Sequence, residues 1–304
     1  MRFIKFKAVS AAIVLAGALT ACGDAGSDDG GDSGNDASAP EINAADDCDG
    51  KFEEGSRMAE LADAGTINVG VRFDQPGLGF KGGADKIPAG FDVEMAKLLV
   101  ADLCIDPDDT GKVNYEETIS DNREPYLEAG RVDLVAASYS ITDERREKVG
   151  QAGPYFLTGQ QVLVKSDSDV ESIEDLQGEE VCAASGSTSL EHINEEGAVG
   201  VPADTYSICA EQVSDGSVPA MSTDGSILLG LAAQYDGELK VVGDPFSEER
   251  IGIGYGKDHP EMCQWINDVL QKAYDDGTWA QAFESTLGAS GAETPEPPAL
   301  DSCS

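Results

Sequence analysis

Basic residues are scarce in this 304-residue chain. It contains 20 lysines and arginines against 58 aspartates and glutamates, which gives a formal net charge of −38 at pH 7. Proteins that bind nucleic acid need a cationic surface to displace counterions from phosphate, and a basic patch that attaches to anionic lipid needs the same. The composition therefore argues against both functions.

Catalytic and metal-binding motifs are also few. The chain has two histidines, His192 and His259, and neither has a partner at the spacing of a metal site. The sequence contains no Cys-x-x-Cys pair, no Gly-x-Ser-x-Gly and no phosphate loop ending in Gly-Lys-Ser or Gly-Lys-Thr. We therefore expect a protein that is not an enzyme and that uses no cofactor and no metal.

The N-terminus carries a short apolar run behind three basic residues. The run, Ala8 to Leu19, is shorter than the ~20 residues that span a bilayer. This arrangement is typical of an export signal, here residues 1–21. It ends in Leu-Thr-Ala-Cys22, which resembles a bacterial lipobox, in which the cysteine is lipidated and becomes the first residue of the mature chain. The alternative is an ordinary cleaved signal followed by a chance cysteine.

Residues 22–47 form an acidic segment rich in Gly, Ser and Asp. From Gly23 to Asp47 it has eight acids and no lysine or arginine. Such a segment has too little apolar surface to fold. We expect it to be a flexible tether between a lipid anchor at Cys22, on the outer face of the cell membrane, and a folded body.

Six cysteines follow Cys22 in the chain. An even number of cysteines in an exported protein indicates disulfides, here three. Six cysteines allow 15 pairings, and the sequence by itself leaves them open. We expect the sequential pairing, which a bridge between Cys48 and Cys303 would contradict. The expected bridges are Cys48–Cys104, Cys182–Cys209 and Cys263–Cys303.

The body alternates short apolar runs with segments of helical periodicity. Apolar residues recur at helical spacing in residues 91–103 and 262–273, which predicts two helices. Alternation of this kind favours an α/β fold with largely parallel sheets, and the length suggests about two domains. The predicted strands are residues 67–71, 133–137, 162–164, 181–184 and 240–242.

One segment after a predicted strand has the donors of an anion site. Ser138 and Ser140 supply hydroxyl groups, and Arg145 follows one helical turn later. Arginine presents two parallel N–H donors that match a carboxylate. The alternative is a capping turn in which Thr142 or Asp143 begins a helix and Arg145 is exposed.

Two further segments stand between a strand and a helix. Residues 184–189 read Ala-Ser-Gly-Ser-Thr-Ser, and a glycine turn that opens a helix binds anions through free N–H groups. Residues 218–225 contain Asp224. Local sequence fits a plain helix cap equally well at both places.

Two arginines stand near the ends of other elements. Arg72 lies in residues 69–76, and Arg123 lies in residues 120–125. Either one could be half of a surface ion pair, which typically contributes ~0–1 kcal/mol.

The segment Ser138-Tyr-Ser-Ile-Thr-Asp-Glu-Arg145 resembles the hallmark of polar amino-acid-binding proteins of bacterial ABC transporters, solute-binding family 3. The likeness runs from about residue 48 to 288. Residues 73–79 and 90–93 are similar to those of actinobacterial glutamate-binding members. The resemblance implies a monomeric, extracytoplasmic lipoprotein that captures an amino acid and delivers it to an ABC permease and its ATPase.

The family likeness also implies a role for each candidate residue. Arg145 would hold the α-carboxylate of the ligand, with the Ser140 hydroxyl and the Ser138 backbone N–H as further donors. Asp224 would bind the α-ammonium group. Arg72 and Arg123 would hold a side-chain carboxylate, which points to L-glutamate. The remaining candidate contacts are Ser187 and Thr188.

The implied fold is the two-lobed periplasmic-binding-protein-like type II fold, with two parallel or mixed sheets joined by a two-strand hinge. Lobe 1 would comprise residues 48–157 and 248–290, lobe 2 residues 158–247, and a Pro-rich tail residues 291–304. Three alternatives stay open: a binder of aspartate or glutamine, an enzyme of the cyclohexadienyl-dehydratase type on the same fold, and a lipid-anchored sensor that signals through a kinase.

Overall fold

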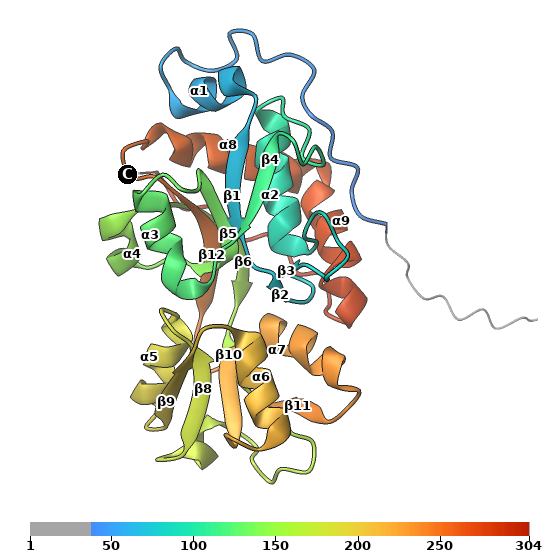
Figure 1. Cartoon of the computed structure of the whole chain (residues 1–304), viewed down its shortest axis with the longest axis vertical. Helices are drawn as coiled ribbons and strands as arrows, with labels where there is room; N and C mark the ends of the chain where they lie inside the picture. Colours follow the sequence, from blue (N-terminus) through green and yellow to red (C-terminus); the bar gives the residue numbers. More distant parts are fainter. Residues whose placement is uncertain (1–37, 304) are drawn as a thin grey trace, which may run out of the picture. The chain divides into compact units, whose positions relative to one another are not determined.

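The computed structural model describes residues 38–303, and two five-stranded sheets organise them (Figure 1). The first sheet has the strand order β4-β1-β5-β12-β6, and the second has the order β11-β7-β10-β8-β9. We call the first sheet, with the helices that pack on it, the first half, and the second sheet with its helices the second half. The strands of the first sheet are β1 (Ile67–Val71), β4 (Val113–Glu117), β5 (Leu134–Ser140), β6 (Gly150–Thr158) and β12 (Glu249–Tyr255). Those of the second are β7 (Gln160–Lys165), β8 (Glu180–Ala184), β9 (Val199–Ala203), β10 (Ala220–Asp224) and β11 (Leu239–Val242).

Both sheets mix parallel and antiparallel pairs. In the first, β1 pairs in parallel with β4 and β5, whereas β12 runs antiparallel to β5 and β6. In the second, β8 pairs in parallel with β9 and β10, whereas β7 runs antiparallel to β10 and β11. The α/β class expected from the sequence is confirmed, and the five predicted strand segments all fall within or overlap strands of the structure.

Helices cover the two sheets. The helices of the first half are α1 (Arg57–Ala64), α2 (Phe91–Asp102), α3 (Arg123–Glu128), α4 (Asp143–Lys148), α8 (Glu261–Asp276) and α9 (Thr278–Ser285). Those of the second half are α5 (Thr188–Glu195), α6 (Tyr206–Asp215) and α7 (Gly225–Ala232). Short 3₁₀ turns occupy Ser120–Asn122, Ile173–Leu176, Ala233–Tyr235 and Gly288–Ser290, and a two-stranded hairpin is formed by β2 (Asp74–Gln75) and β3 (Gly79–Phe80).

Aromatic residues fill the centre of the first half. Phe91, at the start of α2, is fully buried and contacts four other rings. They belong to Tyr155, Phe156, Trp279 and Phe283, at centroid distances of 5.9, 5.8, 5.6 and 5.4 Å. Burial of one such side chain stabilises the folded state by roughly 1.5–3 kcal/mol. This packing joins α2, β6 and α9.

The chain passes from the first sheet to the second at Gly159 and returns through residues 243–248. These two crossing segments lie against each other. A Cβ atom at residue 159 would come within 2.5 Å of the Ser247 carbonyl oxygen, so glycine is required for the close approach.

Three disulfides join the cysteines in the sequential order expected from the sequence. They are Cys48–Cys104, Cys182–Cys209 and Cys263–Cys303, and they close loops with sequence separations of 56, 27 and 40 residues. The second lies wholly in the second half, where it ties α6 to β8.

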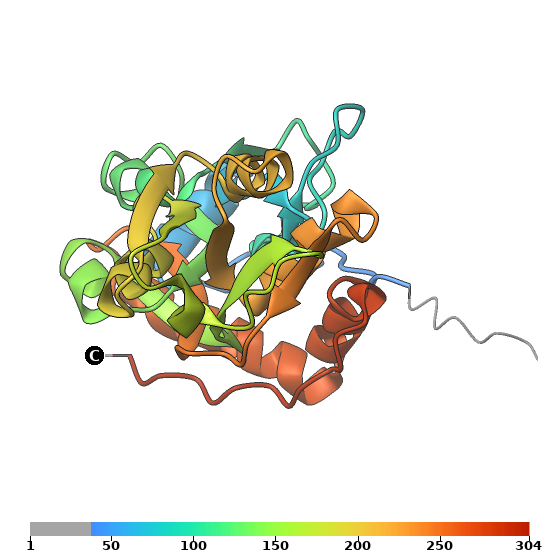
Figure 2. The same ribbon diagram turned by 90° about the horizontal axis from the view of Figure 1, so that it is seen from below.

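The C-terminal tail is extended and is fastened to the first half. Figure 2 shows it as a red segment that runs along one side of the molecule to the C-terminal mark. Asp301 forms ion pairs with Arg146 and Arg250, and its backbone N–H donates to the Gly153 carbonyl. Together with the disulfide at Cys303, these contacts hold the Pro-rich tail in place.

Part of the expected tether lies on the folded body. The Ala45 backbone N–H donates to the Ala101 carbonyl at 2.8 Å, and Pro40 is buried. The apolar side chains near this end explain why the segment packs although the tract as a whole is acidic. The signal at residues 1–21 and the lipidation site Cys22 lie outside the described residues. Within residues 38–303, no helix has both the length and the apolar character to cross a membrane.

Candidate functional site

The segment that follows β5 buries its arginine. Thr142 caps α4, because its hydroxyl accepts the Arg145 N–H at 3.2 Å. Arg145 itself is only 7% exposed, so the alternative of a capping turn with an exposed arginine is half right: the cap exists, but the guanidinium points inward.

The Arg145 guanidinium is oriented by groups from both halves. It donates from Nη1 to the Ser140 carbonyl at 2.8 Å and from Nη2 to the Gly186 carbonyl at 3.1 Å. Its Nε lies 3.1 Å from a Glu124 carboxylate oxygen. A guanidinium has five N–H donors. These contacts fix the orientation of the fork and leave N–H groups for an anion.

Arg123 lies beside it and has no carboxylate partner within the described residues. Its guanidinium donates to the carbonyls of Ser120, Ala137, Ser138 and Gly186, at 3.0 to 3.3 Å. Burial, with the nearby charge of Arg145, lowers the pKa of Arg123 to about 10. The group remains cationic at neutral pH, and its charge is compensated by backbone dipoles and by the face of the Tyr139 ring, 4.6 Å away.

Arg72, the third arginine, is fully buried and already has a carboxylate partner. Its Nε and Nη2 donate to the two oxygens of Asp74 at 2.8 and 2.9 Å, the bidentate arrangement of a strong ion pair. Its Nη1 reaches the Ser120 hydroxyl at 3.4 Å. Since Ser120 also accepts from Arg123 through its carbonyl, one turn links both arginines.

Ser138 is held by a network that the sequence did not reveal. It has a positive φ of 45°, which is rare for a residue other than glycine. Its backbone N–H donates to Asp92 at 2.7 Å, and its hydroxyl donates to Gln75 at 2.7 Å. The buried Asp92 also accepts from the Tyr155 hydroxyl at 2.6 Å. Burial raises the pKa of Asp92, although these hydrogen bonds oppose the rise.

Two candidate residues of the second half, Ser187 and Thr188, have different roles. Ser187 shapes its own loop, and Thr188 contacts the first half. The Ser187 hydroxyl donates to the Ala184 carbonyl at 2.6 Å and accepts the Leu190 N–H, so it caps α5. The Thr188 hydroxyl lies 3.4 Å from that of Ser140 and 3.3 Å from a carboxylate oxygen of Glu249. Thr188 therefore lies at the junction of the two halves.

Asp224 ends β10 and is 4% exposed. It stands at the cap position of α7, but its side chain makes no cap hydrogen bond, and no described residue donates to its carboxylate. Burial first, and then the negative charge of Glu249, raise the pKa of Asp224 well above the ordinary range. The positive charges of Arg123 and Arg145 oppose this rise in the pKa of Asp224.

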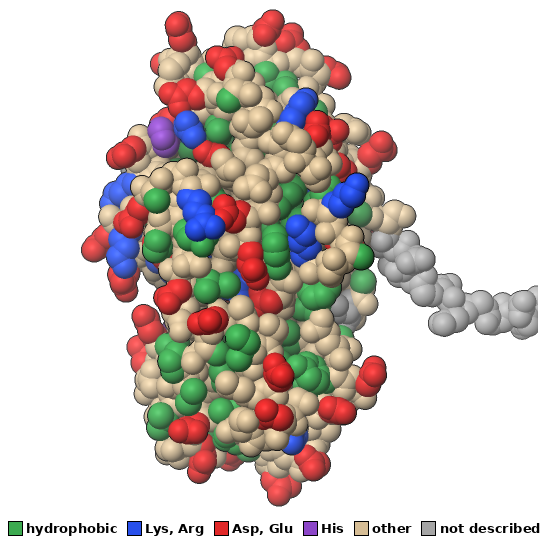
Figure 3. All heavy atoms as spheres, viewed as in Figure 1, with side chains coloured by type: hydrophobic (Ala, Val, Ile, Leu, Met, Phe, Trp, Pro, Cys, Tyr) green, Lys and Arg blue, Asp and Glu red, His purple; other side chains and the backbone are tan. Residues whose placement is uncertain are grey.

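A cavity of about 660 Å³ opens at this junction. Its lining includes Arg145 and Ser120 from the first half and Gly186 and Thr188 from the second. The volume falls in the ~300–1,000 Å³ range of small-molecule sites. Acidic side chains are scattered over the surface shown in Figure 3, whereas the three candidate arginines are buried. Of these arginines only Arg145 lines the cavity, Asp224 does not line it, and acidic side chains outnumber basic ones in the lining.

Comparison with known protein families assigns most of the chain to one family. A model of the bacterial extracellular solute-binding proteins, family 3, matches residues 67–289. The chain belongs to this family. The family member GluB, the glutamate-binding protein of Corynebacterium glutamicum, is 36% identical over 297 residues, which cover 94% of this chain and 91% of GluB. The ABC transporter glutamine-binding protein GlnH of Bacillus subtilis is 31% identical and covers 78% of this chain and 86% of its own length.

Solved structures of solute-binding proteins match the fold. An ancestral arginine-binding protein bound to glutamine superposes with a TM-score of 0.68 at 33% identity, over 74% of this chain and 98% of that protein. The two-lobed type II periplasmic-binding-protein fold expected from the sequence is confirmed.

Hydrogen bonds join six of the eight candidate residues of this solute-binding protein into one network, and Ser187 caps the neighbouring helix. The Asp224 carboxylate makes no hydrogen bond to this network among the described residues, and the charges of Arg123 and Arg145 act on its pKa. The residues that sequence reasoning missed are Asp74, Gln75, Asp92, Glu124, Tyr155, Gly186, Tyr206 and Glu249. Five of these lie in stretches that the sequence analysis singled out: Asp74 and Gln75 in residues 73–79, Asp92 in 90–93, Glu124 in 120–125 and Gly186 in 184–189. Tyr155, Tyr206 and Glu249 stand on other elements, and nothing local marks them.

Proposed function

We propose that this protein binds L-glutamate outside the cytoplasm and passes it to an ABC permease and its ATPase. The observation that carries the proposal is a buried Asp224 carboxylate with no donor among the described residues, together with the buried guanidinium groups of Arg123 and Arg145, whose charges act on it. An α-amino acid carries the complementary groups, an ammonium and a carboxylate. A buried charge without a partner is costly, so a ligand whose ammonium group meets Asp224 gains affinity, and its carboxylate can use the N–H groups that the arginines still have free.

Glutamate is favoured over a neutral amino acid because the site has more than one buried guanidinium. Arg145 can hold the α-carboxylate while Arg123, which has no carboxylate partner among the described residues, attracts a second one. The 36% identity to GluB, a glutamate-binding protein, supports the same assignment.

A second candidate ligand is glutamine. The bidentate pairing of Arg72 with Asp74 cancels one of the three positive charges, which favours a neutral amide side chain. GlnH, a relative, is a glutamine-binding protein. The relative affinity for glutamate and glutamine depends on how much positive charge remains near the side chain of the bound ligand.

We also propose that the two halves act as lobes that close on the ligand. Lobe 1 comprises residues 48–157 and 248–290, lobe 2 comprises residues 158–247, and the crossing segments at Gly159 and residues 243–248 act as the hinge. The contacts of Arg123 and Arg145 with Gly186 support this, because they join side chains of one half to the binding loop of the other. Closure of this kind is a hinge motion around a ligand.

Membrane attachment is a further part of the proposal. The sequence at residues 19–22 supports lipidation of Cys22 after removal of residues 1–21. Mass spectrometry of the N-terminal peptide of the mature protein tests this: a diacylglycerol-modified Cys22 supports the anchor, and an unmodified peptide that begins at another residue contradicts it.

Calorimetric titration of the mature protein against the twenty amino acids tests the ligand assignment. The expected result is strongest binding of L-glutamate, with weaker binding of glutamine and aspartate. Strongest binding of glutamine would replace the first assignment by the second. Absence of binding to every amino acid would contradict the function.

A further inference from the structure

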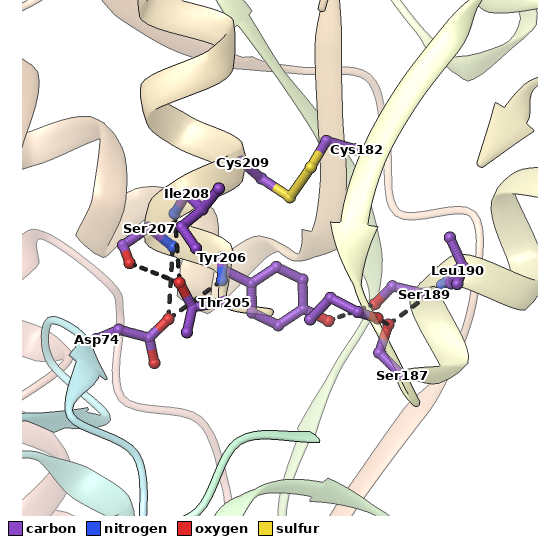
Figure 4. The surroundings of a disulfide bond; sticks show 11 residues. Asp74, Cys182, Ser187, Ser189, Leu190, Thr205, Tyr206, Ser207, Ile208 and Cys209 are labelled. Atoms are coloured by element: carbon purple, nitrogen blue, oxygen red, sulfur yellow. Dashed lines mark hydrogen bonds between the residues drawn. A yellow bond between two sulfur atoms is a disulfide. The ribbon is translucent and has the colours of Figure 1, made fainter. Parts of the chain in front are cut away.

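Asp74 lies at a contact between the two halves that the proposed ligand contacts do not require. It belongs to β2 in the first half, and Arg72 holds both of its carboxylate oxygens. Its Oδ2 also accepts the backbone N–H of Tyr206 at 3.1 Å and that of Ser207 at 3.4 Å. These two N–H groups belong to the first turn of α6 in the second half, as Figure 4 shows.

The first turn of a helix has N–H groups without partners inside the helix, and a carboxylate satisfies them and interacts favourably with the helix dipole. In α6 the chain itself supplies one cap: the Thr205 hydroxyl accepts the Ile208 N–H at 3.4 Å. Asp74 supplies the partner for the two preceding N–H groups. The beginning of α6 is therefore completed by a residue of the other half.

The helix that receives Asp74 is firmly connected to the candidate binding loop. The disulfide Cys182–Cys209 ties α6 to β8, the strand that leads into residues 184–189 (Figure 4). The Tyr206 hydroxyl donates to the Ser189 hydroxyl at 3.2 Å, which joins α6 to α5. A displacement of α6 would therefore also move the loop that carries Gly186 and Thr188.

We infer that Asp74 is a positioning residue that holds the two halves together, with one carboxylate shared between Arg72 and the beginning of α6. This inference rests on the proposed binding function and extends it to the control of closure. When the halves separate, Asp74 stays with the buried Arg72, and the two N–H groups of α6 pass to water. The contact therefore stabilises the closed arrangement before any ligand adds its own bridges.

Arg72 gives this contact a link to ligand recognition. Its guanidinium lies 5.8 Å from the centre of the Tyr206 ring, so it faces both Asp74 and the first residue of α6. A ligand that contacts Arg72 would meet a group already engaged in holding the halves together. The same pair would thereby influence the affinity for the ligand and the rate at which the halves open.

The test measures the distance between the halves in the mature protein without ligand. Spin labels on non-natural residues at the exposed positions Asp63 and Glu179, which leave the disulfides intact, report this distance by pulsed electron resonance. Asp74→Ala should shift the distance distribution to longer values. It should also accelerate glutamate release by about 10-fold, because the hydrogen bonds that are lost involve a charged group.

The matched control is Thr205→Ala, which removes the cap that the second half gives itself and leaves Asp74 in place. It should lower the melting temperature and leave the distance distribution unchanged. Ser207→Pro removes one donor from the opposite side of the contact at a first-turn position where proline is tolerated, so it should lengthen the distance in the same direction as Asp74→Ala, by less. This second variant keeps the test available if Asp74→Ala fails to fold.

An unchanged distance distribution in both Asp74→Ala and Ser207→Pro would overturn the inference. An equal shift in Thr205→Ala would do the same, because it would assign the effect to the stability of α6. The distance measurement needs no ligand, whereas titration of the unmodified protein with glutamate tests the proposed function. The two proposals can therefore fail separately.

Discussion

The two halves of the site treat their charges differently. In the first half, every candidate guanidinium is satisfied: Arg72 by Asp74, Arg145 by Glu124 and carbonyls, and Arg123 by four carbonyls. In the second half, the Asp224 carboxylate is buried with no donor among the described residues. The first half is thus prepared for a ligand, whereas the second half has a charge that a ligand would neutralise.

This difference has an energetic consequence. Arginine fixed by backbone carbonyls needs little rearrangement when an anion arrives, because its planar group is already oriented. An uncompensated buried carboxylate raises the free energy of the ligand-free protein, and binding of an ammonium group relieves that cost. The contrast between the two halves can be tested at each of these groups.

The largest effect is expected at Arg145. Arg145→Ala should abolish detectable amino-acid binding, since a buried carboxylate of the ligand would lose its bidentate partner, a loss of ~2–5 kcal/mol. Calorimetric titration with glutamate measures the change. Arg146→Ala, on the same helix but paired with Asp301 away from the site, is the matched control and should bind normally. Unchanged affinity in Arg145→Ala would show that this residue does not hold the α-carboxylate.

The second prediction concerns the unpaired acid. Asp224→Asn should weaken glutamate binding by about 1.5–3 kcal/mol, because a charged hydrogen-bond acceptor is lost. In the ligand-free protein at neutral pH, the same change should raise the melting temperature, because it removes the cost of burying a carboxyl group whose pKa burial raises. Scanning calorimetry with and without glutamate reads both effects. A variant that is less stable without ligand would contradict the contrast between the halves.

The pH dependence follows from the same group. Burial raises the pKa of Asp224 in the folded protein, so between the ordinary aspartate range and that raised value the folded state binds more protons than the unfolded state. The stability that Asp224 contributes is therefore greatest at acidic pH and falls as the pH rises. Asp224→Asn should remove part of this slope in ligand-free protein. The remainder belongs to groups such as Asp92, whose pKa is also raised.

A smaller, ligand-dependent effect is expected at the side-chain end of the site. Arg72→Ala and Arg123→Ala should each weaken glutamate far more than glutamine, because only glutamate has a second carboxylate. Both ligands are titrated against each variant, so that a general loss of structure cancels in the comparison. Arg250→Ala, whose guanidinium pairs with Asp301 in the tail, serves as the control. Equal losses for both ligands would remove these arginines from side-chain recognition.

The smallest effect should appear in the association rate. The chain carries a formal charge of −38, which repels a dianionic ligand at a distance, whereas the site attracts it at short range. Added salt at low ionic strength should therefore accelerate glutamate association, because the Debye length falls to ~8 Å at physiological salt. Stopped-flow measurements across a salt series give the rate. A pronounced slowdown would mean that attraction by the arginines extends beyond the repulsion by the surface.

Local sequence was sufficient to predict the helices and strands on which the candidate residues stand. The apolar run before Ser138 predicted β5, and Thr142 was recognised as one possible cap of the helix that follows. The helices at residues 91–103 and 262–273 were predicted from periodicity, because a helix buries one face at a spacing that the sequence records directly. Strand ends and helix starts therefore placed the candidate residues correctly along the chain.

Local sequence was misleading where distant segments meet. The acidic tract before Cys48 was expected to be free, but Ala45 bonds to the end of α2, more than fifty residues away in the chain. The composition of that short window gave no information about the partner that the fold brings to it. Arg72 is a different case, because its partner Asp74 is only two residues away, and an ion pair was one of the two alternatives open for it.

The sequence by itself determined the chemistry of this protein: which residue types follow which strands, an excess of acidic side chains, and an even set of cysteines after Cys22. Those properties follow from side-chain identity and from periodicities of two and 3.6 residues, which act over a few positions. Only the tertiary structure decided which charges are paired. Whether Asp74 reaches the N–H groups of α6, or Asp224 meets no donor, depends on strands and helices from two halves converging. A hydrogen bond between the halves depends on tenths of an ångström that no local pattern encodes.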